Sequence, residues 1–246
     1  MTEWSNFEVR QAPDDAKIWR YMSLSKYKSL LKSSGLYLAP LTVMEDQFEG
    51  TLPPDMQVSK QLRERHMPEI AVSLAARVLK SSRGRIMINC WHLNSGESDA
   101  MWKLYCGSDE AVCLETTYGQ LKAELPAGAK MGLVNYVDFD EVRMPTLPGS
   151  LEMAFLKRQA FSHESEVRVF LSGLGDDEYK ARFWLEFVRP NTKGVVIPVN
   201  LPKIVNSIRV HPSMGEGFVR KVEQETQELG YAFGVSPSEL SPRPSY

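Results

Sequence analysis

The stretch Phe161-Ser162-His163-Glu164-Ser165-Glu166-Val167-Arg168-Val169-Phe170 decides the fold expected for this chain. From Glu164 onward, charged residues alternate with Ser165, Val167 and Val169, which is the two-residue period of a half-buried β-strand. The charged face of that strand then carries two carboxylates and a guanidinium close together. Two interpretations stay open. The charges pair across strands on an exposed face, or the carboxylates line a cleft that receives an electron-poor group.

The composition is that of an ordinary globular protein. The chain has 246 residues, of which 43% are hydrophobic and 24% charged, enough for one large domain or two small ones. A formal net charge of -2 argues against a protein that wraps a polyanion, although a local basic patch stays open. The three cysteines do not suit a disulfide framework, and the sequence has no apolar run of membrane-spanning length. We therefore expect a cytoplasmic protein without a membrane segment.

Three segments are expected from the composition along the chain. Residues 1–17 are polar and predict a loosely held N-terminal arm. Residues 18–235 predict a single domain. Residues 236–246, rich in proline and serine, predict a flexible tail.

Short strands mixed with helices indicate the fold class. The first unit is a strand at 18–23, a helix capped by Ser25 and stopped by Gly35, and a strand at 36–38. Further strands are expected at 86–91, 111–117, 133–137, 182–188, 194–198 and 208–210, and helices at 57–80, 99–105, 118–125, 151–158 and 213–230. In the helical region 57–80, the residues expected to contact the core are Leu62, Ile70, Leu74 and Val78. Without regular βαβ alternation, this pattern predicts an α+β domain with a mixed, largely antiparallel sheet flanked by helices.

Common cofactor motifs are missing from the sequence. There is no glycine-rich phosphate loop and no nucleophile elbow. Glu45, Asp46 and Glu49 fit no EF-hand spacing, and Cys90-x-His92 has no second ligand pair for zinc. We therefore expect no metal.

A series of short motifs resembles a bacterial family, the domain of unknown function 2971, from about Trp19 to His211. The motifs are Arg20-Tyr21, Asp46-x-Phe48-Glu49, Asn89-Cys90-Trp91, Met101-Trp102-x-x-Tyr105, Asn135-Tyr136, and Phe155-Leu156-Lys157-Arg158 followed by Glu164-x-Glu166-x-Arg168. The sequence departs from that family at Gln47, where proline is usual, and at Trp91-His92, where phenylalanine and serine are common. The resemblance implies a fold more than a function.

A second resemblance implies an activity. The stretch Trp19-Arg20-Tyr21-Met22-Ser23, followed by Leu30-Leu31-x-x-x-Gly35-Leu36, resembles the first strand and helix of ADP-ribosyltransferases. That resemblance implies a split sheet and NAD as the substrate, with Arg20 contacting NAD and Glu166 or Glu164 supplying the catalytic carboxylate. The hydroxyl residue that those enzymes carry on a middle strand has no counterpart between Asn89 and His92.

The resemblance leads to a set of expected roles. Glu166 would stabilise the oxocarbenium-like ribose as nicotinamide leaves, and Glu164 would accept a proton from the acceptor nucleophile. The residues expected to bind the NAD cofactor are Arg20, Tyr21, Trp91, Trp102, Tyr105 and Arg168. Arg20 or Arg168 is expected to pair with the glutamates if the charges are structural.

Other functions stay open beside NAD transfer or hydrolysis. The same cleft suits a non-catalytic module that binds a nucleotide or an RNA end, and an internally paired strand suits a protein-interaction domain. The acceptor, whether protein, nucleic acid or water, and the oligomeric state are not determined by the sequence.

The hypothesis predicts that Glu166→Gln abolishes NAD consumption while thermal unfolding changes little, because an amide cannot balance the charge that develops on the ribose. Nicotinamide release and thermal unfolding of wild type and variant measure the two effects. A wild-type protein that neither binds nor turns over NAD would end the enzyme hypothesis.

Overall fold

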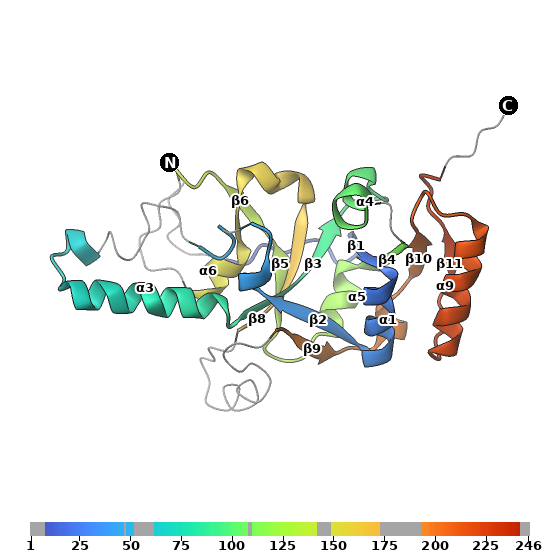
Figure 1. Ribbon diagram of the computed structural model, residues 1–246, viewed down its shortest axis with the longest axis horizontal. Coiled ribbons are helices and arrows are strands. Elements are labelled where there is room, and N and C mark those ends of the chain that lie inside the picture. Colours follow the sequence, from blue (N-terminus) through green and yellow to red (C-terminus); the bar gives the residue numbers. More distant parts are fainter. Residues whose placement is uncertain are drawn as a thin grey trace.

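The computed structural model describes residues 8–46, 48–51, 62–107, 110–141, 149–172 and 193–241 (Figure 1). The strands are β1 Lys17–Ser23, β2 Gly35–Pro40, β3 Ile86–Leu93, β4 Ala111–Thr117, β5 Lys130–Leu133, β6 Asn135–Val137, β7 Leu156–Arg158, β8 Glu166–Ser172, β9 Val195–Pro198, β10 Ser207–Val210 and β11 Val235–Pro237. The helices are α1 Leu24–Ser33, α3 Glu69–Arg83, α4 Asp99–Tyr105, α5 Tyr118–Ala123, α6 Ser150–Phe155, α8 Leu201–Ile204 and α9 Glu216–Glu228, with 3₁₀ turns η1 Leu41–Val43 and η3 Gln159–Glu164.

One nine-stranded sheet organises the fold. Its strands follow the order β11-β10-β4-β1-β3-β2-β9, and β8 pairs with both β3 and β5. The pairs within this sheet are antiparallel except for β10–β11. The expected α+β domain with a mixed, largely antiparallel sheet is confirmed.

The sheet separates between β1 and β3. These strands pair only at Ile18–Leu93 and Trp19–His92, whereas β1 pairs with β4 along its whole length. Arg20 is the first residue beyond the pairing, and its Nη1 donates a 2.8 Å hydrogen bond to the carbonyl oxygen of Cys90. A side chain therefore bridges the two strands where the backbone ladder stops.

Helices cover both faces of the sheet, and the hydrophobic clusters that they form differ between the two faces. On one face, α1, α5, α8 and α9 contribute to a large hydrophobic cluster that includes Tyr27, Leu121, Ile204 and Val222. The other face is covered in two patches. Apolar residues of α6, β7 and η1 pack on β3 and β8, and α4 packs its Trp102 beside Trp19 and Tyr21. Part of the candidate site lies on this second face, between the two patches, and its larger cavity is also lined by α1.

Local corrections follow from the helix ends. Helix α1 is capped by Ser23 rather than Ser25, and its C-terminal residue in the left-handed conformation is Ser34, with φ of 47°, rather than Gly35. Helix α6 ends at Phe155, because 156–158 pair with β6 as a parallel strand. The expected strand at 182–188 lies outside the described residues.

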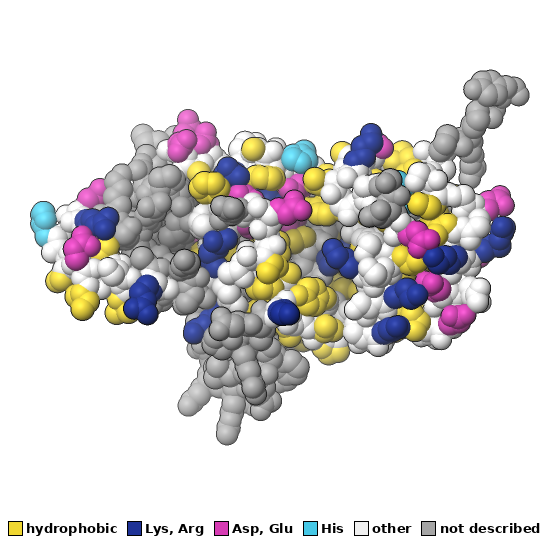
Figure 2. All heavy atoms as spheres, viewed as in Figure 1, with side chains coloured by type: hydrophobic (Ala, Val, Ile, Leu, Met, Phe, Trp, Pro, Cys, Tyr) yellow, Lys and Arg dark blue, Asp and Glu magenta, His cyan; other side chains and the backbone are white. Residues whose placement is uncertain are grey.

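Helix α3 differs from expectation in what it buries. Ile70 and Leu74 are 82% and 61% exposed, while Val72 is buried. Figures 1 and 2 show α3 extending from one end of the fold with hydrophobic side chains along its exposed edge. The expected core role of Ile70 and Leu74 is wrong. No helix within the described ranges has both the length and the apolar character needed to cross a membrane.

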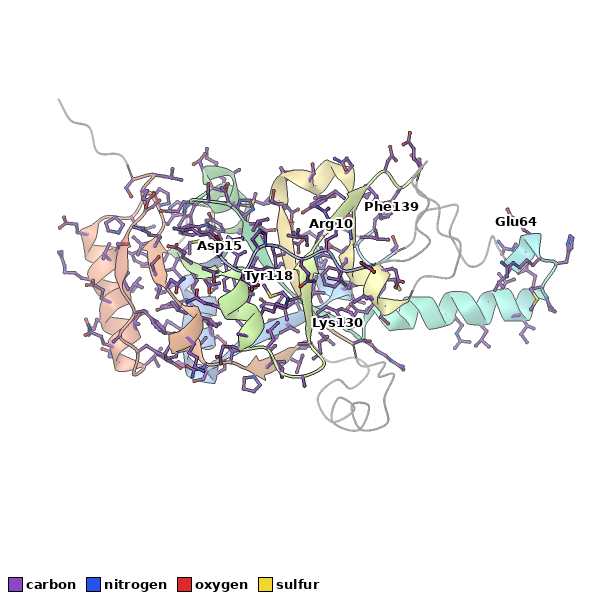
Figure 3. All side chains as sticks on the ribbon, turned by 180° about the vertical axis from the view of Figure 1, so that it is seen from behind. Arg10, Asp15, Glu64, Tyr118, Lys130 and Phe139 are labelled. Carbon is purple, nitrogen blue, oxygen red and sulfur yellow. The ribbon has the colours of Figure 1, made fainter. Side chains whose placement is uncertain are left out.

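Both ends of the chain contact the domain over their described parts. In the N-terminal arm, the Arg10 carbonyl accepts a 2.8 Å hydrogen bond from the Leu133 amide, and Ala12 is buried. Figure 3 shows the stretch that carries Arg10 and Asp15 crossing the back of the fold near Tyr118. At the other end, β11 extends to Pro237 and the Ser238 hydroxyl bonds Glu97, so the ordered fold continues beyond residue 235.

The close approach of the arm to β5 depends on Gly132. A Cβ at this position would lie 2.6 Å from the Arg10 carbonyl oxygen and against the Val9 side chain. We expect Gly132→Ala to lower the free energy of unfolding by about 1–3 kcal/mol and to increase amide exchange in residues 9–12. Chemical denaturation and hydrogen exchange measure both. The matched change Gly217→Ala, in open space on α9, is expected to be neutral or stabilising. Equal effects of the two changes would contradict the close packing of the arm.

Candidate functional site

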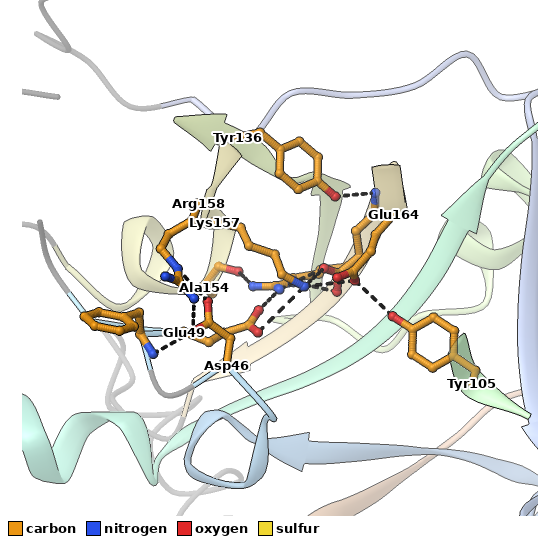
Figure 4. Close-up of polar contacts among 11 residues, drawn as sticks. Asp46, Glu49, Tyr105, Tyr136, Ala154, Lys157, Arg158 and Glu164 are labelled. Atoms are coloured by element: carbon orange, nitrogen blue, oxygen red, sulfur yellow. Dashed lines mark hydrogen bonds and ion pairs between the residues drawn. The ribbon is translucent and has the colours of Figure 1, made fainter. Parts of the chain in front are cut away.

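Five buried charged side chains meet where the two patches of the second face adjoin (Figure 4). They are Glu49, Lys157, Glu164, Glu166 and Arg168, each at most 6% exposed. They come from the turn after η1, from β7, from the end of η3 and from β8. The face of β8 that was expected to be half-exposed is therefore buried, because α6, β7 and the Glu49 turn cover it.

Arg168 is the most enclosed member of this ion cluster. It is 0% exposed, pairs with Glu49, and donates from Nε to Glu166 Oε1 at 2.8 Å. A third donor, Nη1, reaches the carbonyl oxygen of Ala154. Burial lowers the pKa of Arg168 to about 9, so the guanidinium keeps its charge at neutral pH. Because Arg168 is enclosed and paired, its expected contact with a cofactor is replaced by a structural role.

Lys157 connects all three carboxylates of the cluster. Its Nζ lies 2.9 Å from Glu164 Oε2, 3.2 Å from Glu166 Oε2 and 3.7 Å from Glu49 Oε2. Burial on its own would lower the pKa of Lys157, but the carboxylates of Glu166 and Glu164 outweigh it and raise that pKa. Lys157 therefore holds a positive charge at the centre of the cluster.

Glu164 and Glu166 do not share a strand face as expected. Ser165 adopts a left-handed conformation with φ of 40°, so Glu164 ends η3 and β8 begins only at Glu166. Glu166 is held through both oxygens by Arg168 and Lys157, and burial raises its pKa. The described partners of Glu164, Lys157 and the Tyr105 hydroxyl at 2.9 Å, both contact Oε2. Its Oε1 has no described partner, so Glu164 is the better placed of the two to meet a ligand.

A cavity of about 470 Å³ opens where β1 and β3 separate. It is lined by β1, α1, β2 and β3, with Tyr105 of α4 and Val196 of β9. Two cations, Arg20 and Lys26, lie on its wall, and no described residue that lines it carries a carboxylate. This cationic cavity therefore favours an anionic ligand.

Arg20 is the central charged group of the cationic cavity. Its guanidinium donates to the Cys90 carbonyl and lies 5.8 Å from the Trp91 ring. Within the described ranges Arg20 makes no ion pair. The expected alternative, a salt bridge from Arg20 to Glu164 or Glu166, is therefore absent there. Burial lowers the pKa of Arg20, yet an arginine remains protonated at neutral pH. Its other donors are directed to no described carboxylate.

A second, smaller cavity of about 40 Å³ adjoins the first. Both are lined by Tyr21, Cys90 and Tyr105. The smaller one is also lined by Glu164 and Glu166, together with Trp19, Trp91, His92 and Met101. Burial lowers the pKa of His92, which favours its neutral form. The described wall of this acidic cavity thus carries carboxylates and no permanent cation.

The residues expected to bind a cofactor fall into two groups. Arg20 lines the cationic cavity, Trp91 lines the acidic one, and Tyr21 and Tyr105 line both. Trp102 lines neither: it is 1% exposed, packs edge-on against Tyr21 and donates to Glu97. Trp102 and Tyr105 both lie on α4, but only Tyr105, which is 49% exposed, reaches the site.

Sequence reasoning missed Glu49, Lys157 and Lys26. Lys157 was assigned to a helix C-terminus, and its place between apolar Leu156 and the acidic stretch that follows is a signal that could have suggested a buried partner. No family model, curated protein or solved structure matches the chain. The two family resemblances therefore stay predictions.

The cluster makes Lys157 the residue whose removal should cost most. We expect Lys157→Met to lower the free energy of unfolding at pH 7 by about 3–5 kcal/mol, because three buried carboxylates lose a shared cation. Chemical denaturation measures this. The matched change Lys103→Met removes an exposed ion pair to Asp99 and should cost at most about 0.5 kcal/mol. By the same reasoning, Glu166→Gln is now expected to destabilise the fold, in contrast to the sequence-based expectation.

The pH dependence of the difference between wild type and Lys157→Met tests the same contacts. Because the folded-state pKa of Lys157 is raised above 10.5, its stabilisation is complete below that pH and is lost as pH rises through the folded-state value. As pH rises from 7, the difference in unfolding free energy should therefore stay constant and begin to narrow only above pH 10.5. A difference that is small at pH 7, or that narrows between pH 7 and pH 10, would contradict the contacts described.

Proposed function

We propose that the chain binds NAD where the cationic and acidic cavities meet and cleaves the bond between nicotinamide and ribose. One observation carries the proposal: Arg20 and Lys26 line one cavity, Glu164 and Glu166 line the next, and Cys90 and Tyr105 line both. NAD has the same division of charge, with an anionic pyrophosphate and a cationic nicotinamide ring. The acidic cavity, at about 40 Å³, is too small to hold the ring itself, so its carboxylates would face the nicotinamide ribose across the junction of the two cavities.

The cationic cavity suits the nucleotide part of NAD in size and chemistry. Its volume of about 470 Å³ lies within the range of pockets that bind small ligands. The planar guanidinium of Arg20 can donate two parallel hydrogen bonds to phosphate oxygens. Lys26 adds a positive charge on α1. Ser29 and Ser33 also line the cavity; the Ser33 hydroxyl already donates to backbone carbonyl oxygens, which leaves Ser29 to meet a ribose.

In the proposed reaction, Glu164 acts on the nicotinamide ribose. The bond breaks through an oxocarbenium-like state, and a carboxylate beside the ribose gains interaction as positive charge develops there. Glu164 takes this role because its described contacts involve one oxygen only, whereas both oxygens of Glu166 are held by cations. Glu166 then serves as a positioning residue that keeps Lys157 and, through it, Glu164 in place.

A second candidate, a non-catalytic nucleotide-binding module, is favoured by one observation. Lys157 lies within 3.2 Å of both Glu164 and Glu166 and neutralises part of their charge. A carboxylate so paired offers less stabilisation to a developing cation. This candidate shares the cationic cavity with the first and differs from it only in lacking turnover.

Two substitutions separate binding from chemistry. We expect Arg20→Ala to weaken binding of NAD and ADP-ribose by about 10- to 100-fold, because a charged hydrogen bond to phosphate is lost. We expect Glu164→Gln to bind NAD but to release nicotinamide at least about 100-fold more slowly. Calorimetry measures the first effect and chromatography of nicotinamide the second.

The control is Arg220→Ala, which removes an exposed arginine on α9 and should leave both readouts unchanged. If wild type binds NAD without releasing nicotinamide, the second candidate replaces the first. If neither NAD nor ADP-ribose binds, both candidates are wrong.

A further inference from the structure

The acidic cavity limits what can react with the ribose. Its volume of about 40 Å³ accommodates water molecules, each of which needs at least about 10–15 Å³, but not a peptide side chain or a nucleobase. Glu164 and Glu166 line this cavity, so it lies on the carboxylate side of the place where the cationic and acidic cavities meet. A nucleophile that approaches the ribose from the carboxylates must pass through or occupy this space.

The walls of the acidic cavity belong to the packed core. Trp19, Trp91 and Met101 are 2%, 3% and 1% exposed, and they lie on paired strands or on α4. Protein interiors are close-packed, so moving buried side chains apart to enlarge a cavity costs free energy. Widening the cavity on the side of these three residues would therefore disturb the packed core, whereas Tyr105, which also lines it, is 49% exposed.

The polar groups of the cavity suit water. The carboxylates of Glu164 and Glu166 accept hydrogen bonds, and the Tyr105 hydroxyl and the Cys90 thiol are also present. Burial and the neighbouring Glu166 raise the pKa of Cys90, so its thiol stays protonated and does not compete as a nucleophile. The described wall thus offers several partners to a small hydroxyl compound.

We propose that the acceptor of the reaction is water, so that the chain is an NAD glycohydrolase; this inference rests on the proposed function. The bond between the ribose C1′ and the nicotinamide nitrogen breaks, and its electron pair neutralises the pyridinium ring. A water oxygen forms the new bond to C1′, and its proton passes to the Glu164 carboxylate and then to solvent. The products are ADP-ribose, nicotinamide and one proton.

Competition between water and alcohols tests the size of the acceptor site. Wild type is incubated with NAD in water containing methanol or ethanol, and free ADP-ribose and its O-alkyl derivatives are separated by chromatography. The expected products are mainly ADP-ribose, with methanol a poor acceptor and ethanol poorer still. The ratio of products formed in one reaction does not depend on how much protein is folded.

A cavity-enlarging variant provides the second arm. Met101→Ala enlarges the acidic cavity, and we expect it to raise the ratio of O-methyl-ADP-ribose to ADP-ribose several-fold over wild type. Met153→Ala truncates an equally buried methionine in the separate cluster around α6, and the ratio should stay at the wild-type value.

The outcomes distinguish this inference from the proposed function. Nicotinamide release accompanied by ADP-ribose attached to protein or nucleic acid, followed with adenine-labelled NAD, would overturn the inference and leave NAD cleavage standing. Equal use of methanol and ethanol by wild type, or an unchanged ratio in Met101→Ala, would also overturn it. Absence of nicotinamide release would remove the proposed function and the inference together.

Discussion

The buried guanidinium of Arg168 is the constraint on which this part of the fold depends. Arg168 lies on β8, where it also pairs with Glu166, and it joins this strand to the Glu49 turn and to the backbone of α6 at Ala154. None of these segments is adjacent to another in the chain, so the arginine fixes how the second face of the sheet is covered. Removing a charged group of this kind from water is costly unless its donors are satisfied, and the contacts around Arg168 meet that condition.

The same cluster determines which carboxylate is available for chemistry. Because Arg168 and Lys157 occupy both oxygens of Glu166, that residue is fixed in the interior. Glu164 lies two residues before the strand begins, where the left-handed Ser165 ends the 3₁₀ turn, and its carboxylate accepts a hydrogen bond from Tyr105. Two glutamates that are only two positions apart in the sequence thus differ in their contacts, and the proposed function gives a structural role to Glu166 and a ligand-facing role to Glu164.

How far the sequence predicts this arrangement depends on how local each signal is. The strand at 86–91 and the helix at 99–105 have strong local signals, and both are present, the helix with Ser98 as its N-cap. The break after Glu164 has no such signal, because serine seldom adopts positive φ and the surrounding alternation reads as continuous strand. The pairing of 156–158 with β6, which ends α6 early, depends on contacts made only in the folded chain. Likewise, the periodicity of α3 shows that it has an apolar face but not whether the fold covers Ile70 and Leu74.

The contrast between two arginines supports a ligand at the separation of β1 and β3. Arg168 is enclosed and meets two carboxylates, whereas half-buried Arg20 meets a single carbonyl and the face of Trp91 within the described ranges. Partial removal of Arg20 from water without a counter-charge costs free energy in the unliganded protein. An anion that enters the cavity would recover that cost as binding energy. Within the described ranges, Arg20 lies at an open cavity without an ion-pair partner, and Lys157 already holds the nearby carboxylates of Glu164 and Glu166. This arrangement is expected of a binding site and not of a structural ion pair.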